Sequence, residues 1–506
     1  PHLHFQVIAL DPLCDDGIEG ADPHNFPGVA LQRLRAVWES VLPDPSAFAG
    51  LPPGAVTTTG AHADPVLRQR DLAARRRTVL GSSLSLSYDD PIHMVRGVGA
   101  YLYDDAARRY LDTVNNVPHV GHGNRRVANA IARHSRLLNT NTRYLHGEIV
   151  ALADELLAHF PAPLAVVFLV CSGSEANELA LRMARCHTGN DGVVCLEGGY
   201  HGNTGGLVEV SQYKFDGPGG SGPSDRVAVA PMPDAYRGRY RRDEGLDDDE
   251  MARRYSDDVA RAAARLDTAG GGPGVAAFIA EPILSCGGQI EPPPGYLDAS
   301  FRHIRRAGGV CLADEVQVGF GRVGDAFWGF ELQGVVPDIV TLGKPMGNGH
   351  PVAAVVTTRE IADSFANGME YFSTFGGNPV SCAAARAVLA EIRDRGLQEH
   401  ARTVGGGLLE GLRKLTADHP FVGDVRGRGL FLGIEFVRDR DSREPFPEAC
   451  TYLVNRAREM GVLLSVDGPD HNVIKIKPPL VFGEAEAELL VETLGAVLNE
   501  SALAVR

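Results

Sequence analysis

The sequence lacks the features that would direct a protein to a membrane or to nucleic acid. Its hydrophobic runs are short: the densest, residues 164–170, has the length of a buried strand and not the ~18–20 apolar residues of a membrane span. It also lacks a basic excess, because 49 Lys and Arg face 64 Asp and Glu and leave a net charge of −15. A surface of that sign repels polyanions, so a small-molecule partner is favoured.

The eight cysteines form no C-x-x-C pair, which argues against a zinc knuckle or a dithiol redox motif. They indicate thiols in a reducing compartment, and no basic-then-apolar leader follows Pro1, so we expect a cytoplasmic protein. His2 and His4 would lie on one side of a strand, as in half of a zinc site. The further His and Asp that such a site needs are missing, so no metal is expected.

The composition and the hydrophobic pattern of the chain change after its first ninety residues. Residues 2–7 alternate like a strand, residues 29–42 have helical periodicity, and residues 51–65 form a Pro/Gly/Thr-rich linker. From Gly97 onward, apolar runs of strand length alternate with helical segments, as in "DGVVCL", "VAAFIAEP", "GGVCLADE", "DIVTLGK" and "PVAAVVTT". This alternation predicts an α/β fold with a mainly parallel sheet.

A candidate anion site lies in "CSGSEANELALR", residues 171–182. Ser172, Gly173 and Ser174 stand where a strand ends and a helix begins, so hydroxyls, backbone N–H groups and the positive helix end converge there. A phosphate would fit this turn. A serine that only caps the helix, with Glu175 completing a capping box, explains the same residues.

An acid and a lysine follow two further strands. Asp314 ends the apolar run in "CLADEVQ", where an ionised carboxylate is costly unless it faces a cation, and Lys344 follows the run in "DIVTLGKPMGNGHP". A structural salt bridge would account for this pair alone. Pyridoxal 5'-phosphate accounts for the pair and the anion site together, because it needs an amine for a Schiff base, a carboxylate for its ring nitrogen and a cradle for its phosphate.

In this order the motifs resemble the class III aminotransferases, pyridoxal-phosphate enzymes of fold type I, from about Ser87 to the C-terminus. The resemblance implies a large cofactor-binding domain with a mainly parallel sheet flanked by helices, and a smaller α+β domain. It divides the chain into four parts: an N-terminal appendage and linker (1–85), the N-terminal part of the small domain (86–114), the large domain (115–390) and the C-terminal small domain (391–506).

The resemblance also implies the roles of single residues. Lys344 forms the Schiff base, Asp314 pairs with the ring nitrogen, and Gln317 reaches the ring hydroxyl. Tyr200 of the "YHG" motif stacks on the ring. The remaining cofactor contacts are expected from Ser172, Gly173, Ser174, His201, Val316 and Thr374. Thr374, in "FSTFGGNP", would reach the phosphate of the neighbouring subunit, which implies a homodimer with shared active sites.

Other motifs resemble a branch that contains ethanolamine-phosphate and phosphohydroxylysine phospholyases, among them "VNNVPHVGHG" and "DGPDHNVIKIKPPL". Lys475 stands where many aminotransferases carry an arginine that clamps a substrate carboxylate, and lysine does not replace arginine at a fork-shaped contact. Glu281, in "IAEP", keeps the aminotransferase form and is a catalytic candidate. Asn116, Arg143 and Tyr144 are expected near the substrate by family position.

We therefore expect a pyridoxal-phosphate aminotransferase of specialised metabolism that moves an amino group from a Glu, Gln or Ala type of donor to an aldehyde or ketone. The cofactor would pass through its pyridoxamine 5'-phosphate form. The alternative is a phospholyase that eliminates phosphate from an O-phospho amino alcohol. A cofactor-binding protein without turnover is disfavoured, because all of the inferred cofactor ligands are present.

Overall fold

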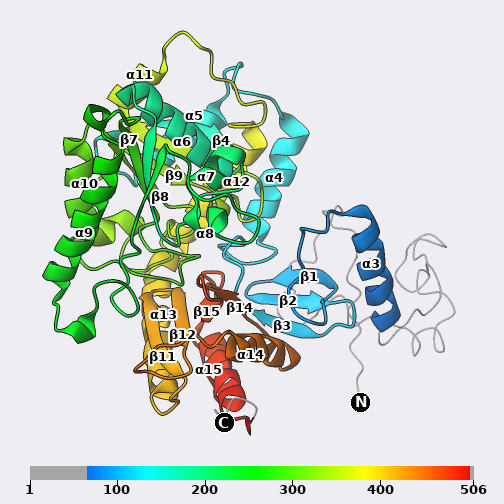
Figure 1. Cartoon of the computed structure of the whole chain (residues 1–506). Helices are drawn as coiled ribbons and strands as arrows, with labels where there is room; N and C mark the ends of the chain where they lie inside the picture. The colour runs from blue at the N-terminus through cyan, green and yellow to red at the C-terminus, as the bar shows by residue number, and fades with distance from the viewer. Residues whose placement is uncertain (1–64, 502–506) are drawn as a thin grey trace. The chain divides into compact units, whose positions relative to one another are not determined.

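The computed structural model describes residues 65–501 (Figure 1). The chain divides into two compact units, the first ending at Leu111 and the second beginning at Asp112. The strand and helix expected at 2–7 and 29–42 lie outside the described residues, as do His2 and His4. The four-part division of the chain stays a prediction.

The described part of the first unit contains a helix and an antiparallel meander, whose last residue already belongs to the second unit: α3 (Pro65–Val79), β1 (Met94–Val98), β2 (Tyr101–Asp104) and β3 (Arg109–Asp112). Asp104 fixes the turn between β2 and β3. Its Oδ1 accepts hydrogen bonds from the backbone N–H groups of Ala106 (2.9 Å) and Arg108 (2.8 Å), and its Oδ2 accepts one from the Tyr110 hydroxyl.

A seven-stranded sheet in the order β4-β10-β9-β8-β7-β5-β6 forms the centre of the second unit. The pairs β5–β6, β5–β7, β7–β8 and β8–β9 are parallel, whereas β10 runs antiparallel to both β9 and β4. The predicted α/β fold is confirmed. The strands are β4 (Leu164–Val170), β5 (Gly192–Leu196), β6 (Val227–Ala230), β7 (Val275–Ala280), β8 (Val310–Asp314), β9 (Ile339–Leu342) and β10 (Ala353–Thr358).

Helices cover both faces of this sheet (Figure 1), and alternate residues of β7 show why. Ala277 and Ile279 pack into the core cluster that contains α6, whereas the ring of Phe278 meets Phe301 of α10 on the other side. All six β7 residues are buried, as expected of an unbroken apolar run. The helices are α4 (Arg125–Leu137), α5 (Gly147–Leu157), α6 (Gly173–Thr188), α7 (Gly205–Glu209), α8 (Gln212–Phe215), α9 (Asp248–Arg265), α10 (Tyr296–Arg306), α11 (Arg359–Phe365) and α12 (Pro379–Asp394).

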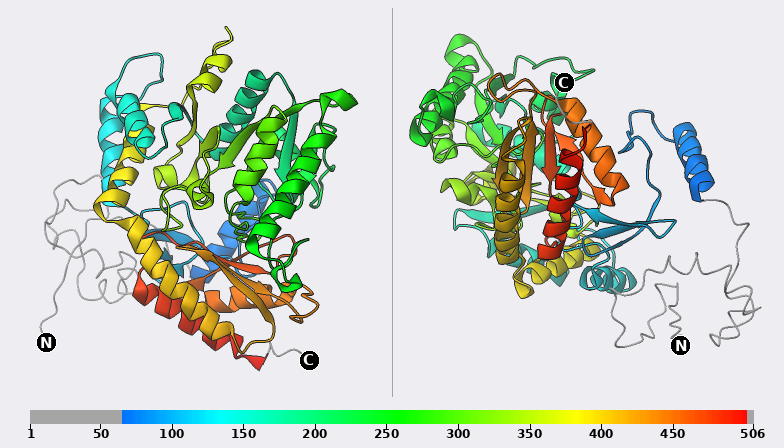
Figure 2. Two further views of the ribbon diagram at one scale, coloured as in Figure 1. Left: turned by 90° about the vertical axis from the view of Figure 1, so that its left-hand side faces the viewer. Right: turned by 90° about the horizontal axis from the view of Figure 1, so that it is seen from below.

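The C-terminal part has its own antiparallel sheet, in the order β11-β12-β15-β14. Helices α13 and α15 lie side by side against it, and α14 contacts α15 (Figure 2). The elements are α13 (Leu397–Thr416), β11 (Val422–Arg428), β12 (Phe431–Phe436), α14 (Pro447–Glu459), β13 (Val462–Leu463), β14 (Ser465–Asp467), β15 (Val473–Ile476) and α15 (Glu484–Leu498). Within residues 65–501, four 3-10 turns lie in the connections around the seven-stranded sheet: η1 (Arg242–Glu244), η2 (Thr268–Gly270), η3 (Gly329–Gln333) and η4 (Lys344–Gly347).

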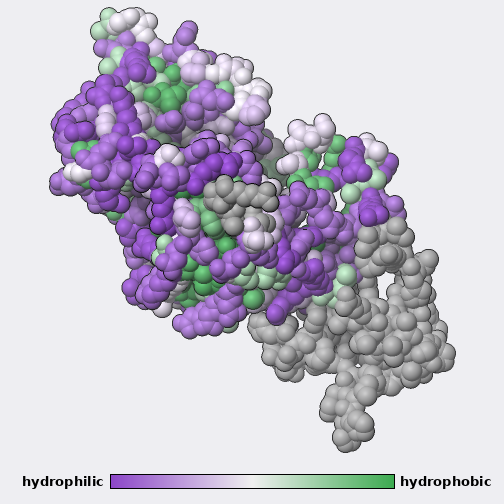
Figure 3. Space-filling view, turned by 60° about the horizontal axis from the view of Figure 1, so that its bottom comes forward, coloured by the Kyte–Doolittle hydropathy of each residue, from purple (hydrophilic) through white to green (hydrophobic). Residues whose placement is uncertain are grey.

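Polar residues dominate the face of the molecule in Figure 3, and hydrophobic residues are scattered among them. Among the helices of residues 65–501, none combines the length and the apolar character needed to cross a bilayer.

Candidate active site

The predicted anion turn, acid and lysine meet at one edge of the seven-stranded sheet. Asp314 ends β8, Lys344 follows β9, and the turn at Ser172–Ser174 follows β4, which runs in the same direction as β9 because β10 lies antiparallel to both. Parallel strands bring their carboxyl ends to one edge, where ligands of α/β proteins bind. This edge is therefore the candidate active site.

Two glycines allow the three loops to close on one another. A Cβ on Gly173 would lie 2.8 Å from Cγ1 of Val316, and a Cβ on Gly343 would lie 3.2 Å from the Cα of Gly173. Either side chain would push the loops apart. Val316, predicted as a cofactor contact, is thus packed between the anion turn and the residue that precedes Lys344.

Asp314 is 4% exposed and is held from three sides. Its Oδ2 accepts a hydrogen bond from Asn177 Nδ2 (2.8 Å) and lies 2.8 Å from His201 Nδ1, and its Oδ1 accepts one from the N–H of Val316 (3.1 Å). Asn177 was not anticipated from the sequence. The available signal was an asparagine among the apolar residues of a helix, since its neighbours Ala176, Leu179 and Ala180 are all buried.

The residues at this edge fit pyridoxal 5'-phosphate. In the described part of the chain, Lys344 makes no hydrogen bond or ion pair, and the buried His201 Nε2 has no partner. Ser172 caps α6 by accepting a hydrogen bond from the N–H of Glu175 (3.1 Å), so the capping interpretation is correct for this side chain. The positive end of the α6 helix dipole and the hydroxyl of Ser174, which contacts Asn203, are still available to bind an anion at this turn. An amine, a carboxylate and an anion turn therefore lie together.

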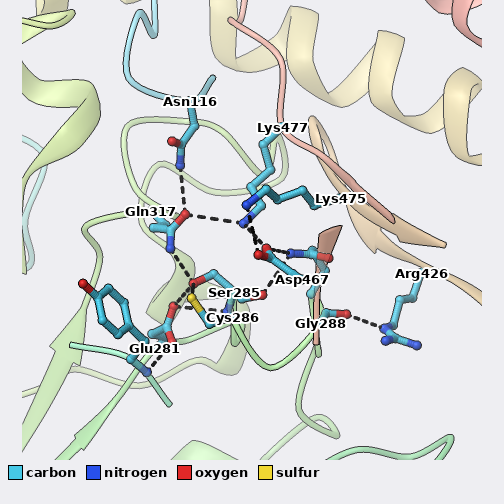
Figure 4. A network of polar contacts seen from close by, with 12 residues as sticks. Asn116, Glu281, Ser285, Cys286, Gly288, Gln317, Arg426, Asp467, Lys475 and Lys477 are labelled. Atoms are coloured by element: carbon cyan, nitrogen blue, oxygen red, sulfur yellow. Dashed lines mark hydrogen bonds and ion pairs between the residues drawn. The ribbon is translucent and has the colours of Figure 1, made fainter. Parts of the chain in front are cut away.

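A second group of side chains is centred on Gln317 (Figure 4). Its Oε1 accepts hydrogen bonds from Asn116 Nδ2 (3.1 Å) and from the Lys477 ammonium (3.4 Å), and its Nε2 donates to Ser285 Oγ (2.5 Å). The Ser285 hydroxyl donates in turn to the carboxyl group of Glu281. The structure thus brings Asn116, Gln317 and Glu281 together, and adds Ser285 and Lys477, which the sequence did not single out.

Glu281 is buried beside the predicted ring-stacking residue. It accepts hydrogen bonds from the backbone N–H groups of Ser285 (3.1 Å) and Tyr200 (3.3 Å). Burial raises the pKa of Glu281, the His201 ring opposes this effect, and the Asp314 carboxylate adds to it. Burial also raises the pKa of Tyr200, with smaller contributions from Cys286, Asp314 and Glu281.

Two lysines share one carboxylate next to Gln317 (Figure 4). Lys475 pairs with Oδ1 of Asp467 at 2.9 Å, and Lys477 pairs with Oδ2 at 3.1 Å. Burial alone would raise the pKa of Asp467, but the two ammonium groups outweigh it and hold this pKa below its usual value. Lys475 was expected near the substrate. Asp467 and Lys477 were not.

Three predicted residues lie in exposed loops instead. Arg143 stacks on the ring of Phe372 at 4.0 Å and pairs with Glu370, so the loops that hold Tyr144 and Thr374 run beside each other. Tyr144 is 66% exposed, and Thr374 is exposed as well. Within the described part of one chain, no contact joins these three side chains to the Gln317 network.

Comparisons with known proteins decide the family. The sequence profile described as "Aminotransferase class-III" matches residues 85–498. The chain belongs to the class III aminotransferase family. The predicted class III assignment and cofactor are thereby confirmed, because class III aminotransferases use pyridoxal 5'-phosphate. The assignment of single site residues stays a prediction.

Relatives of this class III family member have names of two kinds. It is 49% identical over 432 residues to an "Alanine--glyoxylate aminotransferase 2-like" protein of Drosophila melanogaster, covering 84% of this chain and 87% of the relative. It is 41% identical over 456 residues to "Ethanolamine-phosphate phospho-lyase homolog 1" of Caenorhabditis elegans, covering 88% and 96%. Among solved structures, a phospholyase from Arthrobacter in complex with phosphoethanolamine matches with a TM-score of 0.80 and 42% identity, covering 85% of this chain and 99% of that one.

Proposed function

We propose that this class III family member is a pyridoxal-phosphate phospholyase that converts an O-phospho amino alcohol and water into an aldehyde, ammonium and inorganic phosphate. The observation that carries the proposal is the pair of ammonium groups, Lys475 and Lys477, beside Gln317. An ammonium is a compact point charge that suits a tetrahedral phosphate, whereas a planar carboxylate is best clamped by the fork of an arginine.

The arginine beside this network, Arg426, already has protein partners for its guanidinium group. Arg426 donates to the carbonyl of Gly288 (2.9 Å) and pairs with Asp424 (2.9 Å) and Glu435 (2.7 Å). Because three acceptors already occupy this buried guanidinium, it does not offer a bidentate contact to a substrate carboxylate. The similarity to the Arthrobacter and C. elegans proteins supports the same choice of reaction.

The side chains at the sheet edge provide the remaining functions. Bound pyridoxal 5'-phosphate supplies an electron sink next to the substrate nitrogen. Lys344 would hold the cofactor covalently and, once displaced by the substrate amine, would take the proton from the carbon that bears nitrogen. Asp314, held by Asn177 and His201, would pair with the ring nitrogen and keep it protonated.

Phosphate then leaves from the neighbouring carbon. The C–O bond breaks, its electron pair departs with the phosphate oxygen, and a carbon–carbon double bond forms in the remaining fragment. The ammonium of Lys475 stabilises the departing charge. Lys344 would then take back its place on the cofactor and release the product as an enamine, which takes up a proton on carbon and is hydrolysed by water to the aldehyde and ammonium.

Transamination is the second candidate for the same site. Glu281 favours it, because this carboxyl lies beside Tyr200 and Gln317 in the motif form typical of aminotransferases. The 49% identity to the Drosophila protein supports it too. In this reaction Lys344 would return the proton to the cofactor carbon, and the amino group would pass to an aldehyde or ketone.

We also propose that two copies of the chain share their active sites. Exposed apolar side chains lie on the loops around Arg143 and Thr374, which include Leu145, Met369 (71%) and Phe375 (71%). Exposed apolar residues that gather on one part of a surface are typical of a protein interface. Burying them in a homodimer would bring Thr374 of one subunit toward the anion turn of the other. A cytoplasmic location stays a prediction.

One spectroscopic experiment separates the two reactions. The holoenzyme is mixed with O-phosphoethanolamine and, separately, with L-glutamate, while released phosphate and ammonium are assayed. We expect equal, catalytic release of phosphate and ammonium from O-phosphoethanolamine. A stable shift of the cofactor band from ~420 to ~330 nm with glutamate, without phosphate release from the other substrate, would instead establish the transaminase.

A further inference from the structure

The two lysines beside Asp467 project from one face of the antiparallel sheet β11-β12-β15-β14. Lys475 lies in β15 and Lys477 directly follows this strand, so the two side chains point to the same side, whereas the alternating residues Ile474 and Ile476 are fully buried on the other. Asp467 ends the neighbouring strand β14. The sequence "KIK" on one strand and a carboxylate on the next therefore create a compact cluster of two positive charges and one negative charge.

The two lysines are not equivalent. The side chain of Lys477 is 3% exposed, contacts Gln317 Oε1 (3.4 Å) and lies 4.7 Å from the centre of the Phe431 ring. The side chain of Lys475 is 22% exposed and, in the described part of the chain, has Asp467 as its single polar partner. Lys477 is thus fixed by several contacts, and Lys475 is held by one.

Asp467 would keep its other partners if Lys475 moved away. Its Oδ2 still accepts hydrogen bonds from Lys477 (3.1 Å) and from Gln289 Nε2 (2.8 Å), and only Oδ1 loses its partner. A buried carboxylate without any partner would be costly, but one that retains an ammonium and an amide is not. The geometry therefore allows Lys475 to exchange Asp467 for a substrate anion.

Such an exchange favours anions of higher charge. A monoanion that takes Lys475 from Asp467 replaces one negative charge by another, so the gain and the loss are similar. A dianion attracts the same ammonium about twice as strongly at equal distance, and so gains more than the lost ion pair. Competition from the Asp467 carboxylate therefore favours the binding of dianions over monoanions at Lys475.

We infer that Asp467 is a specificity-determining residue: it acts as the resident counter-ion of Lys475, and only a dianionic group such as a phosphate monoester displaces it efficiently. Lys477 and Gln289 hold Asp467 in place during the exchange. The natural ligand in this inference, a substrate phosphate group, rests on the proposed phospholyase function. The test below does not depend on that function.

The test compares two ligands that have the same shape and differ by one negative charge. Ethyl phosphate is a dianion above its second pKa of about 6, and ethyl sulfate is a monoanion throughout. Neither carries an amine, so neither reacts at Lys344, and both can be titrated into the holoenzyme by calorimetry. For the wild type we expect ethyl phosphate to bind at least about tenfold more tightly at pH 8, and this preference to fade below about pH 6.

The Asp467→Asn variant should lose this preference. Without the competing carboxylate, ethyl sulfate should bind about tenfold more tightly than it binds to the wild type, and the ratio of the two dissociation constants should approach one. Asp298→Asn, which removes an exposed carboxylate paired with Arg302, is the matched control and should leave the ratio unchanged. If the Asp467→Asn protein does not fold, because Lys477 is left unpaired, the Asp467→Asn/Lys477→Met double variant removes both buried charges and is measured instead.

The two proposals fail in different ways. If the ratio of the two dissociation constants is the same as in the wild type in whichever Asp467 variant folds, the counter-ion role of Asp467 is overturned, whatever reaction the enzyme catalyses. A wild type that binds ethyl phosphate and ethyl sulfate equally would do the same. Absence of phosphate release from O-phosphoethanolamine, together with a ratio that collapses in the variant, would overturn the phospholyase and leave a dianion-selective subsite.

Discussion

Asn177 and Asp314 are joined by a hydrogen bond of 2.8 Å, although 137 residues separate them in the chain. Asn177 lies in the first turns of α6, the helix whose N-terminus forms the anion turn. One helix therefore positions both ends of the candidate cofactor site: its N-terminal residues form the anion turn, and its Asn177 holds the acid that is predicted to pair with the ring nitrogen.

Replacing Asn177 by leucine should weaken this site without unfolding the protein. The carboxylate of Asp314 would lose one of its partners, so we expect a 10–100-fold loss in cofactor affinity or turnover, as is typical of residues that orient a ligand. Titration of the apoprotein with pyridoxal 5'-phosphate measures the affinity. Asn499→Ala, which removes an exposed asparagine at the end of α15, should have no effect, and equal affinities in all three proteins would contradict the role of Asn177.

Lys344→Ala should abolish covalent attachment of the cofactor. The ~420 nm band of the bound cofactor should disappear, because only the amine of Lys344 can form that link. The thermal midpoint of the apoprotein should change little, since Lys344 makes no polar contact in the described part of the chain. Lys414→Ala, at an exposed lysine paired with Glu410, is the control, and a retained band in the Lys344 variant would refute the assignment.

Gly173→Ala should separate the anion turn from the strand that carries Asp314. The added Cβ would lie 2.8 Å from Val316 Cγ1, and overpacking of this kind costs about 1–3 kcal/mol. We expect a lower thermal midpoint and weaker cofactor binding, with partial recovery in the Gly173→Ala/Val316→Ala double variant. Gly205→Ala is a suitable control because its Cβ would meet nothing within 4 Å. Failure of the second substitution to restore binding would show that the clash lies elsewhere.

Glu315 should make the stability depend on pH. Burial raises the pKa of Glu315 from 4.5 to about 8, although the backbone N–H groups of Gly329 and Phe330 oppose this effect. A carboxyl whose pKa is raised on folding contributes stability that is full below the unfolded pKa and is lost as the pH rises through the folded pKa. Wild-type stability should therefore fall, relative to Glu315→Gln, between about pH 5 and pH 8.

Thermal unfolding at several pH values measures this effect. The midpoint of Glu315→Gln minus that of the wild type should rise by on the order of 5 °C across this range. The exposed Glu410→Gln variant should give a flat difference. A flat difference for Glu315→Gln as well would mean that this carboxyl is ionised in the folded protein throughout.

Thr374→Ala should reveal whether active sites are shared. If Thr374 serves the neighbouring subunit, its loss should lower activity, and so should Lys344→Ala. Mixed dimers of the two variants should recover about half of the wild-type activity per dimer, because one of their two sites combines an intact Lys344 with an intact Thr374. Mixed dimers as inactive as either parent would argue for sites formed within one chain.

The amino-acid sequence by itself determined the strands and the residues at their ends. The apolar runs that became β7, β8 and β9 are long enough only for buried strands, so Asp314 and Lys344 had to stand where strands end. Local sequence also determined the hairpin at residues 101–112 and the helix that follows Ser172, because both depend on neighbours in the chain. The nature of the cofactor followed from these residues.

Only the tertiary structure decided which side chains share a contact. Gln317 meets Asn116 and Lys477 across 201 and 160 residues, and Asp467 holds Lys475 through the pairing of two strands. Nothing in the periodicity of either segment encodes such partners, since strand registry and loop closure depend on the packing of the whole unit. The pairing of charges around Asp467 is therefore set by the fold, while the residues at the strand ends are set by the local sequence.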